Sequence, residues 1–211
     1  KTPNSAKEKE LNEIAIAFTY NTNAIEGSTI TLEEVREIVE EQTSPNKPLR
    51  DVKETESHFK VFLNMLNSKE KFSDRLLLNW HKEIFGETKK DIAGKYRNYL
   101  VRVGNYIAPM PKEIEERMKR LIDFLNNYKL NAVEVSARTH YRFEKIHPFG
   151  DGNGRIGRLI MNKILWDAGY PMLIIEYKNR KSYYKALTKD EDKFVNYFLR
   201  RYFSVNKKRL K

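Results

Sequence analysis

Apolar residues recur at helical spacing along most of the chain. Leu11, Ile14, Ala15 and Phe18 occupy positions i, i+3, i+4 and i+7, which share one face of an α-helix. Further stretches with this spacing follow at residues 59–66, 76–85, 114–125, 132–146, about 153–168 and within 180–203. No fixed-period repeat interrupts them. The pattern predicts an all-α, mainly helical domain.

A second local signal marks the start of one of these helices. The tetrapeptide Thr31-Leu32-Glu33-Glu34 has the form of a capping box, in which Thr31 is the N-cap and the side chain of Glu34 reaches back to it. We predict that a helix begins here and ends before Pro45 and Pro48, which mark a linker.

One segment departs from the helical period. Around residues 99–103, Tyr99, Val101 and Val103 alternate with Leu100 and Arg102. Gly104-Asn105 then supplies a turn before Tyr106-Ile107, and alternation on both sides of such a turn is typical of a β-hairpin. We predict one short hairpin over about residues 99–107.

Length and composition narrow the class of protein. A chain of 211 residues suits a single domain. The absence of cysteine excludes a disulfide-stapled scaffold and a cysteine-ligated zinc site. No apolar run approaches the ~18 residues of a membrane span, and the polar residues 1–10 lack a signal-peptide core. We expect a soluble, cytoplasmic protein.

The formal net charge of +11 is unevenly distributed. Residues 1–50 carry a net charge of −3, whereas residues 151–211 carry +9. A surplus of this size favours an anionic partner such as nucleic acid or phosphate. The basic tail from Arg200 to Lys211 has two interpretations, a solvated chain end or an arm that binds nucleic acid or a partner.

The glycines cluster in one segment. Four of the nine, at positions 150, 152, 154 and 157, lie between two predicted helices in the sequence HPFGDGNGRIGR, residues 147–158. Glycines before a helix let successive backbone N–H groups converge on an anion, which the helix dipole also favours. Arg155 and Arg158, three residues apart, add guanidinium groups suited to phosphate oxygens.

The remaining side chains of this segment suggest transfer of a phosphorus-centred group. Asp151 is a hard oxygen ligand suited to Mg²⁺ that bridges phosphates. His147 is the general-base candidate, since its ordinary pKa of ~6.5 leaves it largely neutral at pH 7. The alternative to a functional role, for each of these residues taken singly, is a structural one. The glycines would then form a turn, the charged side chains would lie in solvent, and the histidine would be a hydrogen-bonded structural residue.

The segment resembles the signature of the Fic (filamentation-induced-by-cAMP) family, H-x-F-x-[DE]-G-N-G-R-x-x-R. All specified positions match, and the resemblance extends over about residues 90–190, including Tyr141-Arg142-Phe143 and Gly169-Tyr170-Pro171. It implies the Fic fold, a helical core with one short β-hairpin flap. It also implies transfer of AMP from ATP to a protein hydroxyl.

The resemblance assigns expected roles within the signature. His147 deprotonates a target Ser, Thr or Tyr, Asp151 holds Mg²⁺, and Phe149 anchors the loop. Gly152, Asn153 and Gly154 line the anion hole, while Arg155 and Arg158 hold the β- and γ-phosphates. The hairpin corresponds to the flap that aligns the target segment by strand addition. Because Gly152 is present, adenylyl transfer is favoured over the kinase action of the Doc-like branch, while uridylyl and phosphocholine transfer stay open.

Three residues after the signature are candidates for the nucleobase. Tyr183 or Tyr184 could stack on adenine, and Asn179 could hydrogen-bond its edge. Packing of the two tyrosines between helices is the alternative.

A second motif lies near the N-terminus. The sequence from Thr22 to Gly27, TNAIEG, resembles the inhibitory motif [ST]-x-x-x-E-[GN] of the family. Without the core signature, this motif would indicate only the end of a helix with a C-terminal glycine cap. The resemblance implies that Glu26 pairs with Arg158, where its carboxylate would occupy the γ-phosphate site. We expect Thr22 to cap the segment locally.

We therefore predict one Fic domain over residues 1–211, with an inhibitory helix region at 1–45, a core at 50–190 and a C-terminal helix with a basic tail at 191–211. The expected function is that of a bacterial protein adenylyltransferase that uses Mg²⁺ and ATP, inhibited by Glu26. Its partners are ATP and a target protein, which could be a second copy; a homo-oligomer is left open, and no membrane or nucleic acid is expected. The alternatives are a de-AMPylase, another nucleotidyl- or phosphotransferase, and a non-catalytic nucleic-acid or protein interaction module.

Overall fold

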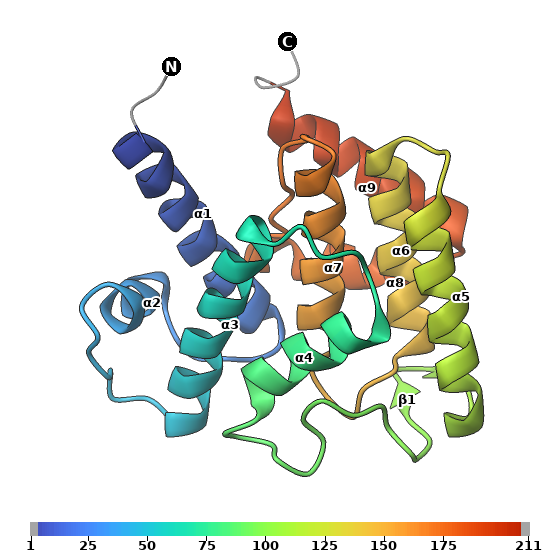
Figure 1. Cartoon of the computed structure of the whole chain (residues 1–211), viewed down its shortest axis with the longest axis horizontal. Coiled ribbons are helices and arrows are strands. Elements are labelled where there is room, and N and C mark those ends of the chain that lie inside the picture. Colours follow the sequence, from blue (N-terminus) through green and yellow to red (C-terminus); the bar gives the residue numbers. More distant parts are fainter. Residues whose placement is uncertain (1–3, 208–211) are drawn as a thin grey trace.

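The computed structural model describes residues 4–207, and these residues form a mainly helical domain (Figure 1). The helices are α1 (Asn4–Ile25), α2 (Leu32–Val39), α3 (Leu49–Asn67), α4 (Asp74–Phe85), α5 (Ile114–Asn127), α6 (Ala132–Ile146), α7 (Asn153–Asp167), α8 (Arg180–Leu187) and α9 (Glu191–Asn206). Two short 3₁₀ turns, η1 (Pro111–Glu113) and η2 (Tyr177–Asn179), precede α5 and α8. The predicted all-α class is confirmed.

Helix α7 forms the centre of the bundle (Figure 1). It packs against α1, α3, α4 and α6, and every residue from Asn153 to Leu165 is buried. Ile156, Leu159 and Ile160 are fully buried, as their helical spacing predicts. A helix covered on all sides needs no polar face. The loop that precedes α7 therefore opens at one end of the bundle, surrounded by elements from distant parts of the sequence.

The predicted capping box is present at the start of α2. The N–H of Glu34 donates to Thr31 Oγ1 at 3.2 Å, and the N–H of Thr31 donates to Glu34 Oε2 at 2.8 Å. Helix α2 ends at Val39, before the predicted linker. These two reciprocal bonds satisfy backbone donors that a helix start leaves without partners.

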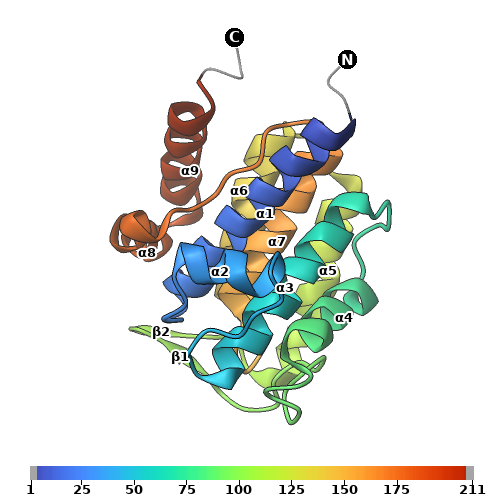
Figure 2. The ribbon, with the colours of Figure 1, turned by 90° about the vertical axis from the view of Figure 1, so that its left-hand side faces the viewer.

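The predicted hairpin is also present, although its strands are only two residues long. Strands β1 (Arg102–Val103) and β2 (Tyr106–Ile107) pair antiparallel, with Arg102 opposite Ile107 and Val103 opposite Tyr106. All four residues are exposed, because the hairpin extends beyond the helices. It lies at the same end of the bundle as the C-terminal end of α1 (Figure 2).

The C-terminal part packs as a helix as far as Asn206. Arg201 on α9 forms an ion pair with Glu176 at 2.7 Å, so this charge of the predicted basic tail has a structural partner. Residues 208–211 of that tail lie outside the described part of the chain. Among residues 4–207, no helix is both long and apolar enough to cross a membrane.

Candidate active site

The site begins at the junction of α6 and the glycine-rich loop. His147 is the C-cap of α6 and adopts the left-handed conformation, with φ 50° and ψ 59°. A non-glycine residue in this region is strained by roughly 1–2 kcal/mol. Arg97 holds the strained backbone, because its Nε donates to the carbonyl oxygen of His147 at 2.7 Å. The same guanidinium donates to the carbonyl oxygens of Tyr99 and Pro109, which ties the base of the hairpin to the loop.

The imidazole of His147 faces a cavity of about 230 Å³. The residues around this cavity come from the α1 end, the hairpin, α6, the signature loop, α7 and α8: Glu26, Val103, Glu144, His147, Gly150, Asp151, Gly152, Asn153, Gly154, Arg158, Tyr183 and Tyr184. Burial lowers the pKa of His147 below 6.5. The side chain is therefore neutral at pH 7 and can accept a proton.

Phe149 anchors the loop as the sequence predicts. It is fully buried, and its ring stacks on that of His81 with centroids 4.0 Å apart. Gly94 N–H donates to Nδ1 of His81, so Nε2 carries the proton that is donated to the carbonyl oxygen of Asp151 at 3.0 Å. Burial lowers the pKa of His81 to about 4, which keeps it neutral. His81 thus positions the loop, a role that its helical pattern did not reveal.

Asn153 lines the cavity, and its side chain holds the signature loop. Its Oδ1 accepts from the N–H of Phe149 at 2.8 Å, and its Nδ2 donates to the carbonyl oxygen of Phe149 at 2.9 Å. The side-chain amide therefore fixes the loop at Phe149. The backbone N–H of Asn153 is left for an anion, together with those of Gly154 and Arg155, since the first N–H groups of α7 have no acceptor within the helix.

Gly152 is required at the N-cap of α7 for two reasons. Its φ of +79° lies in the region that favours glycine, and a Cβ at this position would overlap the ring of Phe85. The backbone can therefore turn into the helix in close contact with α4. This geometry is the one that the predicted anion site needs.

Arg158 is contacted by the C-terminal end of α1. Its guanidinium is almost fully buried, and Nη2 lies 2.6 Å from Glu26 Oε1. The Glu26–Arg158 contact expected from the resemblance is therefore present. Burial opposes the charge of Arg158, but Glu26, together with Tyr183 and Glu144, outweighs it and raises the pKa of the guanidinium. Gly27, with φ 92°, ends α1 beside this pair.

Thr22 does not cap its segment locally, contrary to our expectation. Its Oγ1 accepts from Nε of Arg158 at 2.6 Å, and its carbonyl oxygen accepts from Nη2 at 3.2 Å. Arg158 is buried, so its donors need protein acceptors, and Thr22 supplies two of them. Thr22 and Glu26 are one helical turn apart and together enclose one side of the guanidinium.

Arg155 faces a different wall from Arg158. Its Nη1 lies 2.5 Å from Glu54 Oε2 on α3, and its guanidinium stacks over the ring of Phe85 at 4.4 Å. Lys89 bridges the Oε1 of Glu54 and the Oδ2 of Asp151, each at 2.8 Å. The two signature arginines are thus held by carboxylates from separate helices. Glu54 and Lys89 gave no sequence signal, since nothing in the local pattern links them to a loop 60 to 100 residues away.

Asp151 is suited to hold a cation. Burial acts to raise the pKa of this carboxyl, but Lys89 and Arg155 more than offset the effect and hold the pKa below its usual range. The side chain is 46% exposed, which leaves room for an additional ligand. The described residues contain no group of three or more His, Asp or Glu able to hold a metal. A Mg²⁺ ion here would take its other ligands from phosphate oxygens and water, which is its common mode in nucleotide sites.

The three candidate nucleobase contacts are placed differently. Tyr183 is buried, and its O–H is 2.8 Å from Nε2 of His140, so the packing interpretation describes it. Asn179 does not line the cavity, and its amide donates to Glu176 at 2.8 Å. Tyr184 is 44% exposed at the cavity and donates to the carbonyl oxygen of Ile25. Tyr184 is therefore the one of these three candidates that has a partly exposed side chain at the cavity.

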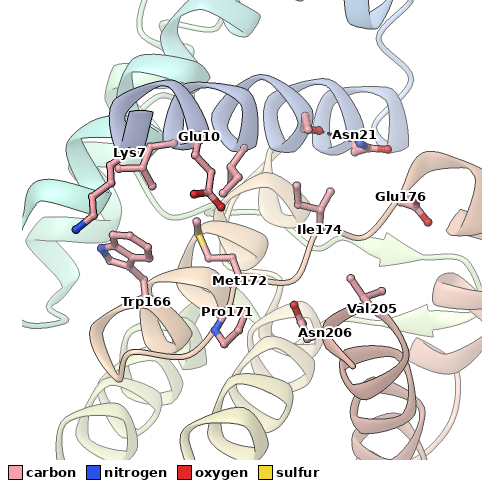
Figure 3. A pocket seen from close by; sticks show the side chains of 13 residues that line it. Lys7, Glu10, Asn21, Trp166, Pro171, Met172, Ile174, Glu176, Val205 and Asn206 are labelled. Atoms are coloured by element: carbon pink, nitrogen blue, oxygen red, sulfur yellow. Dashed lines mark hydrogen bonds between the residues drawn. The ribbon is translucent and has the colours of Figure 1, made fainter. Parts of the chain in front are cut away.

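A larger cavity, of about 680 Å³, lies elsewhere. Figure 3 shows Trp166, Met172 and Ile174 across from α1, with Asn206 of α9 at one side. None of residues 147–158 lines it. Its walls are mostly apolar and hold no nucleophile or phosphate-binding loop, so cavity size does not identify the site.

The fold and the loop define a helical domain with a histidine placed before a glycine-rich helix N-terminus. Residues 71–165 match the Fic/DOC family, and the chain carries a domain of this family. It is 32% identical over 200 residues to "Protein adenylyltransferase Fic" of Nematostella vectensis, covering 91% of this chain and 47% of that relative. The chain therefore spans about half the length of that curated relative.

Solved structures agree with this assignment. A fragment of Fic-1 from Caenorhabditis elegans superposes with a TM-score of 0.87 and 29% identity, covering 99% of this chain and 66% of that one. A Fic domain containing signaling protein from Bacteroides thetaiotaomicron superposes with a TM-score of 0.85 and 24% identity, covering 96% and 87%. The domain has the Fic fold.

Proposed function

We propose that this domain is a protein adenylyltransferase, which transfers AMP from ATP to a Ser, Thr or Tyr hydroxyl of a target protein. The observation that carries the proposal is that His147, the α7 N-terminus and Arg158 line one cavity. The names of the relatives support the same reaction. In this proposal residues 1–45 form the inhibitory region, 50–190 the core and 191–211 the C-terminal helix and tail.

The reaction follows from what each group can do. His147 accepts the proton of the target hydroxyl, whose oxygen attacks the α-phosphorus of ATP. The bond from that phosphorus to the bridging oxygen breaks, and pyrophosphate leaves with the bonding electrons. The N–H groups at the start of α7 stabilise the negative charge that develops on the phosphate oxygens. Asp151 would hold Mg²⁺, whose charge offsets that of the phosphates.

The arginines bind the leaving group in this proposal. Arg158 binds the γ-phosphate once Glu26 has moved away, and Arg155 lies beside the β-phosphate. Tyr184 is the remaining candidate for a contact with adenine. The hairpin, whose backbone is exposed, accepts the target segment as an added strand, since unpaired N–H and C=O groups at a strand edge pair readily with an extended peptide.

We infer that Glu26 inhibits this activity. Its carboxylate already occupies the fork of Arg158 that a γ-phosphate would use, and it brings a negative charge into the site. A Cβ on Gly154 would overlap Glu26 Oε1, so the carboxylate sits directly against the start of α7. ATP must displace this carboxylate before Arg158 can bind a phosphate.

The test is self-labelling with ATP that carries the label on the α-phosphate. Glu26→Gly should raise labelling at least tenfold, and Glu40→Gly, a matched change at an exposed glutamate that ends α2, should leave it at the wild-type level. Glu26→Gly combined with His147→Ala should show none. If Glu26→Gly is labelled no more strongly than the wild-type protein, Glu26 is not inhibitory. If Glu26→Gly labels no protein in a host lysate, the proposed adenylyltransferase activity is refuted.

Removal of AMP from a modified protein is the second candidate. It is favoured by the position of Glu26, whose carboxylate lines the same cavity as His147 and could activate a water molecule. Incubation of an AMP-modified target with the wild-type chain would release AMP in this case. Glu26→Gly would then lose release while gaining transfer.

A further inference from the structure

Besides Glu26 and Asp151, the carboxyl group of Glu144 lines the cavity. Glu144 is on α6, one helical turn before His147, and it lines the same cavity as Glu26 and Arg158. Its Oε1 is buried and has no hydrogen-bond partner. The group is enclosed between α6 and α7, because a Cβ on Gly157 would come within 2.9 Å of this oxygen. A buried carboxyl oxygen without a hydrogen-bond partner is unusual and calls for an explanation.

The neighbours of Glu144 determine its charge. The titratable and charged groups that line the cavity with Glu144 or act on it are Lys145, His140 and His147 on α6, Asp151 in the signature loop, Arg158 on α7, Glu26 at the end of α1, and Tyr183 and Tyr184 on α8. Burial lowers the pKa of His140 to about 3, and burial raises the pKa of Tyr184 to about 12, so both are neutral at pH 7. Burial likewise raises the pKa of Tyr183.

Arg158 is a buried cation that interacts electrostatically with two carboxyl groups of this cavity, those of Glu26 and Glu144. Glu26 bonds to it directly at 2.6 Å, whereas no hydrogen bond joins it to Glu144. Two like charges around one guanidinium disfavour full ionisation of both. Burial raises the pKa of Glu144 to about 7, with Arg158 opposing the shift and Glu26 adding to it.

We propose that Glu144 is a proton-controlled gate on the phosphate site, which admits a nucleoside triphosphate when it is neutral and repels it when it is ionised. The inference rests on the proposed function, since it takes Arg158 as the γ-phosphate ligand. A neutral Glu144 leaves the charge of Arg158 available to the triphosphate. An ionised Glu144 adds a fixed negative charge to a cavity that must also accept the negative charges of the triphosphate.

The direction of the pH effect follows from this arrangement. A bound triphosphate raises the pKa of Glu144, so binding is accompanied by proton uptake. Affinity is then highest at pH values below the pKa of the nucleotide-free site and falls as the pH rises through the interval between the free and bound pKa values. Without Glu26 the pKa of Glu144 lies lower, so in Glu26→Gly the fall begins below pH 7.

The test compares ATP affinity in Glu26→Gly with that in Glu26→Gly/Glu144→Gln by calorimetry at constant Mg²⁺ from pH 5.5 to 8.5. The titrations of ATP itself and of His147 are common to both proteins and cancel in the ratio of their dissociation constants. We expect the dissociation constant of Glu26→Gly to rise by about fivefold to tenfold relative to the double variant, since one pKa unit of linkage changes affinity tenfold.

Two controls separate this gate from a packing role. Uncharged adenosine should show no such change in ratio, because it brings no phosphate. Glu144→Met fills the same space without a titratable group and should behave as Glu144→Gln does. It replaces Glu144→Gln in the comparison if that variant fails to fold. A ratio that stays within twofold for ATP across the pH range overturns the gate while the proposed function stands. No ATP binding by Glu26→Gly at any pH refutes the proposed function itself.

Discussion

Replacement of Glu54 by alanine should destabilise the domain strongly, because this residue holds the signature loop from α3. Glu54 is 5% exposed. Its Oε2 is 2.5 Å from Nη1 of Arg155, and its Oε1 accepts from Lys89 at 2.8 Å and from Thr88 Oγ1 at 2.9 Å. The variant leaves the buried Arg155 with only the longer contact of 3.8 Å to Asp151, while Lys89 keeps its pair with Asp151.

The magnitude follows from this burial. Loss of one partner of a buried ion pair costs about 3–5 kcal/mol, because the other charge stays buried and uncompensated. For a domain of this size, each kcal/mol lowers Tm by about 2–4 °C, so Glu54→Ala should lower Tm by roughly 6–20 °C. Glu54→Gln keeps an oxygen acceptor for Thr88 and should cost less than alanine.

The loss should also depend on pH. Burial acts to raise the pKa of Glu54, but Arg155 and Lys89 outweigh it and lower the pKa below the ordinary value. A depressed pKa means that the ion pair stabilises the fold above the unfolded-state pKa of ~4.3, and that this stabilisation is lost as the pH falls through the folded-state pKa. The difference between wild type and Glu54→Ala should therefore shrink in acid.

Urea unfolding followed by circular dichroism at pH 7 and at pH 3.5 measures both effects. Glu56→Ala is the matched control: Glu56 lies on the same helix, and its pair with Lys60 is exposed on both sides. This control should change the free energy of unfolding by less than about 0.5 kcal/mol. If Glu54→Ala is as stable as Glu56→Ala, the Glu54–Arg155 pair does not hold the loop and the reasoning fails.

Three further predictions concern the chemistry. In the Glu26→Gly background, His147→Ala should reduce AMP transfer at least a hundredfold. The affinity for ATP, measured by calorimetry, should change less than twofold. If labelling persists in this variant, His147 is not the general base. Because the pKa of His147 lies below 6.5, kcat at saturating ATP should rise with pH in the acid range and level off above it. Chelation by EDTA should abolish transfer, with recovery on addition of Mg²⁺, and transfer that survives chelation would exclude Asp151 as a metal ligand.

Much of the fold could be predicted from local sequence patterns. The bounds of α6 match the predicted 132–146, and α7 begins at the predicted Asn153, because a helix is determined by spacing and end signals within a few residues. The capping box and the hairpin turn are local in the same sense. The signature segment likewise has its glycines, histidine and arginines within twelve residues, so the sequence alone indicates its phosphate chemistry.

Contacts between distant segments had no such signal. Arg97 holds the backbone of His147 from 50 positions away, and His81 supports the loop from α4. Both look like ordinary residues within their own segments. The position of Tyr183, buried against His140, likewise follows from a contact between distant segments and could not be separated from base stacking by spacing alone.

The sequence alone therefore determined the helical class, the hairpin and the glycine-rich signature loop, since each depends on neighbours in the chain. Only the tertiary structure decided what each charged side chain pairs with. It placed Glu54 on Arg155, moved Thr22 from a local cap to Arg158, and enclosed Glu144 beside the same guanidinium. The physical reason is that burial and Coulomb interactions depend on distance in space, and helices far apart in sequence meet around α7.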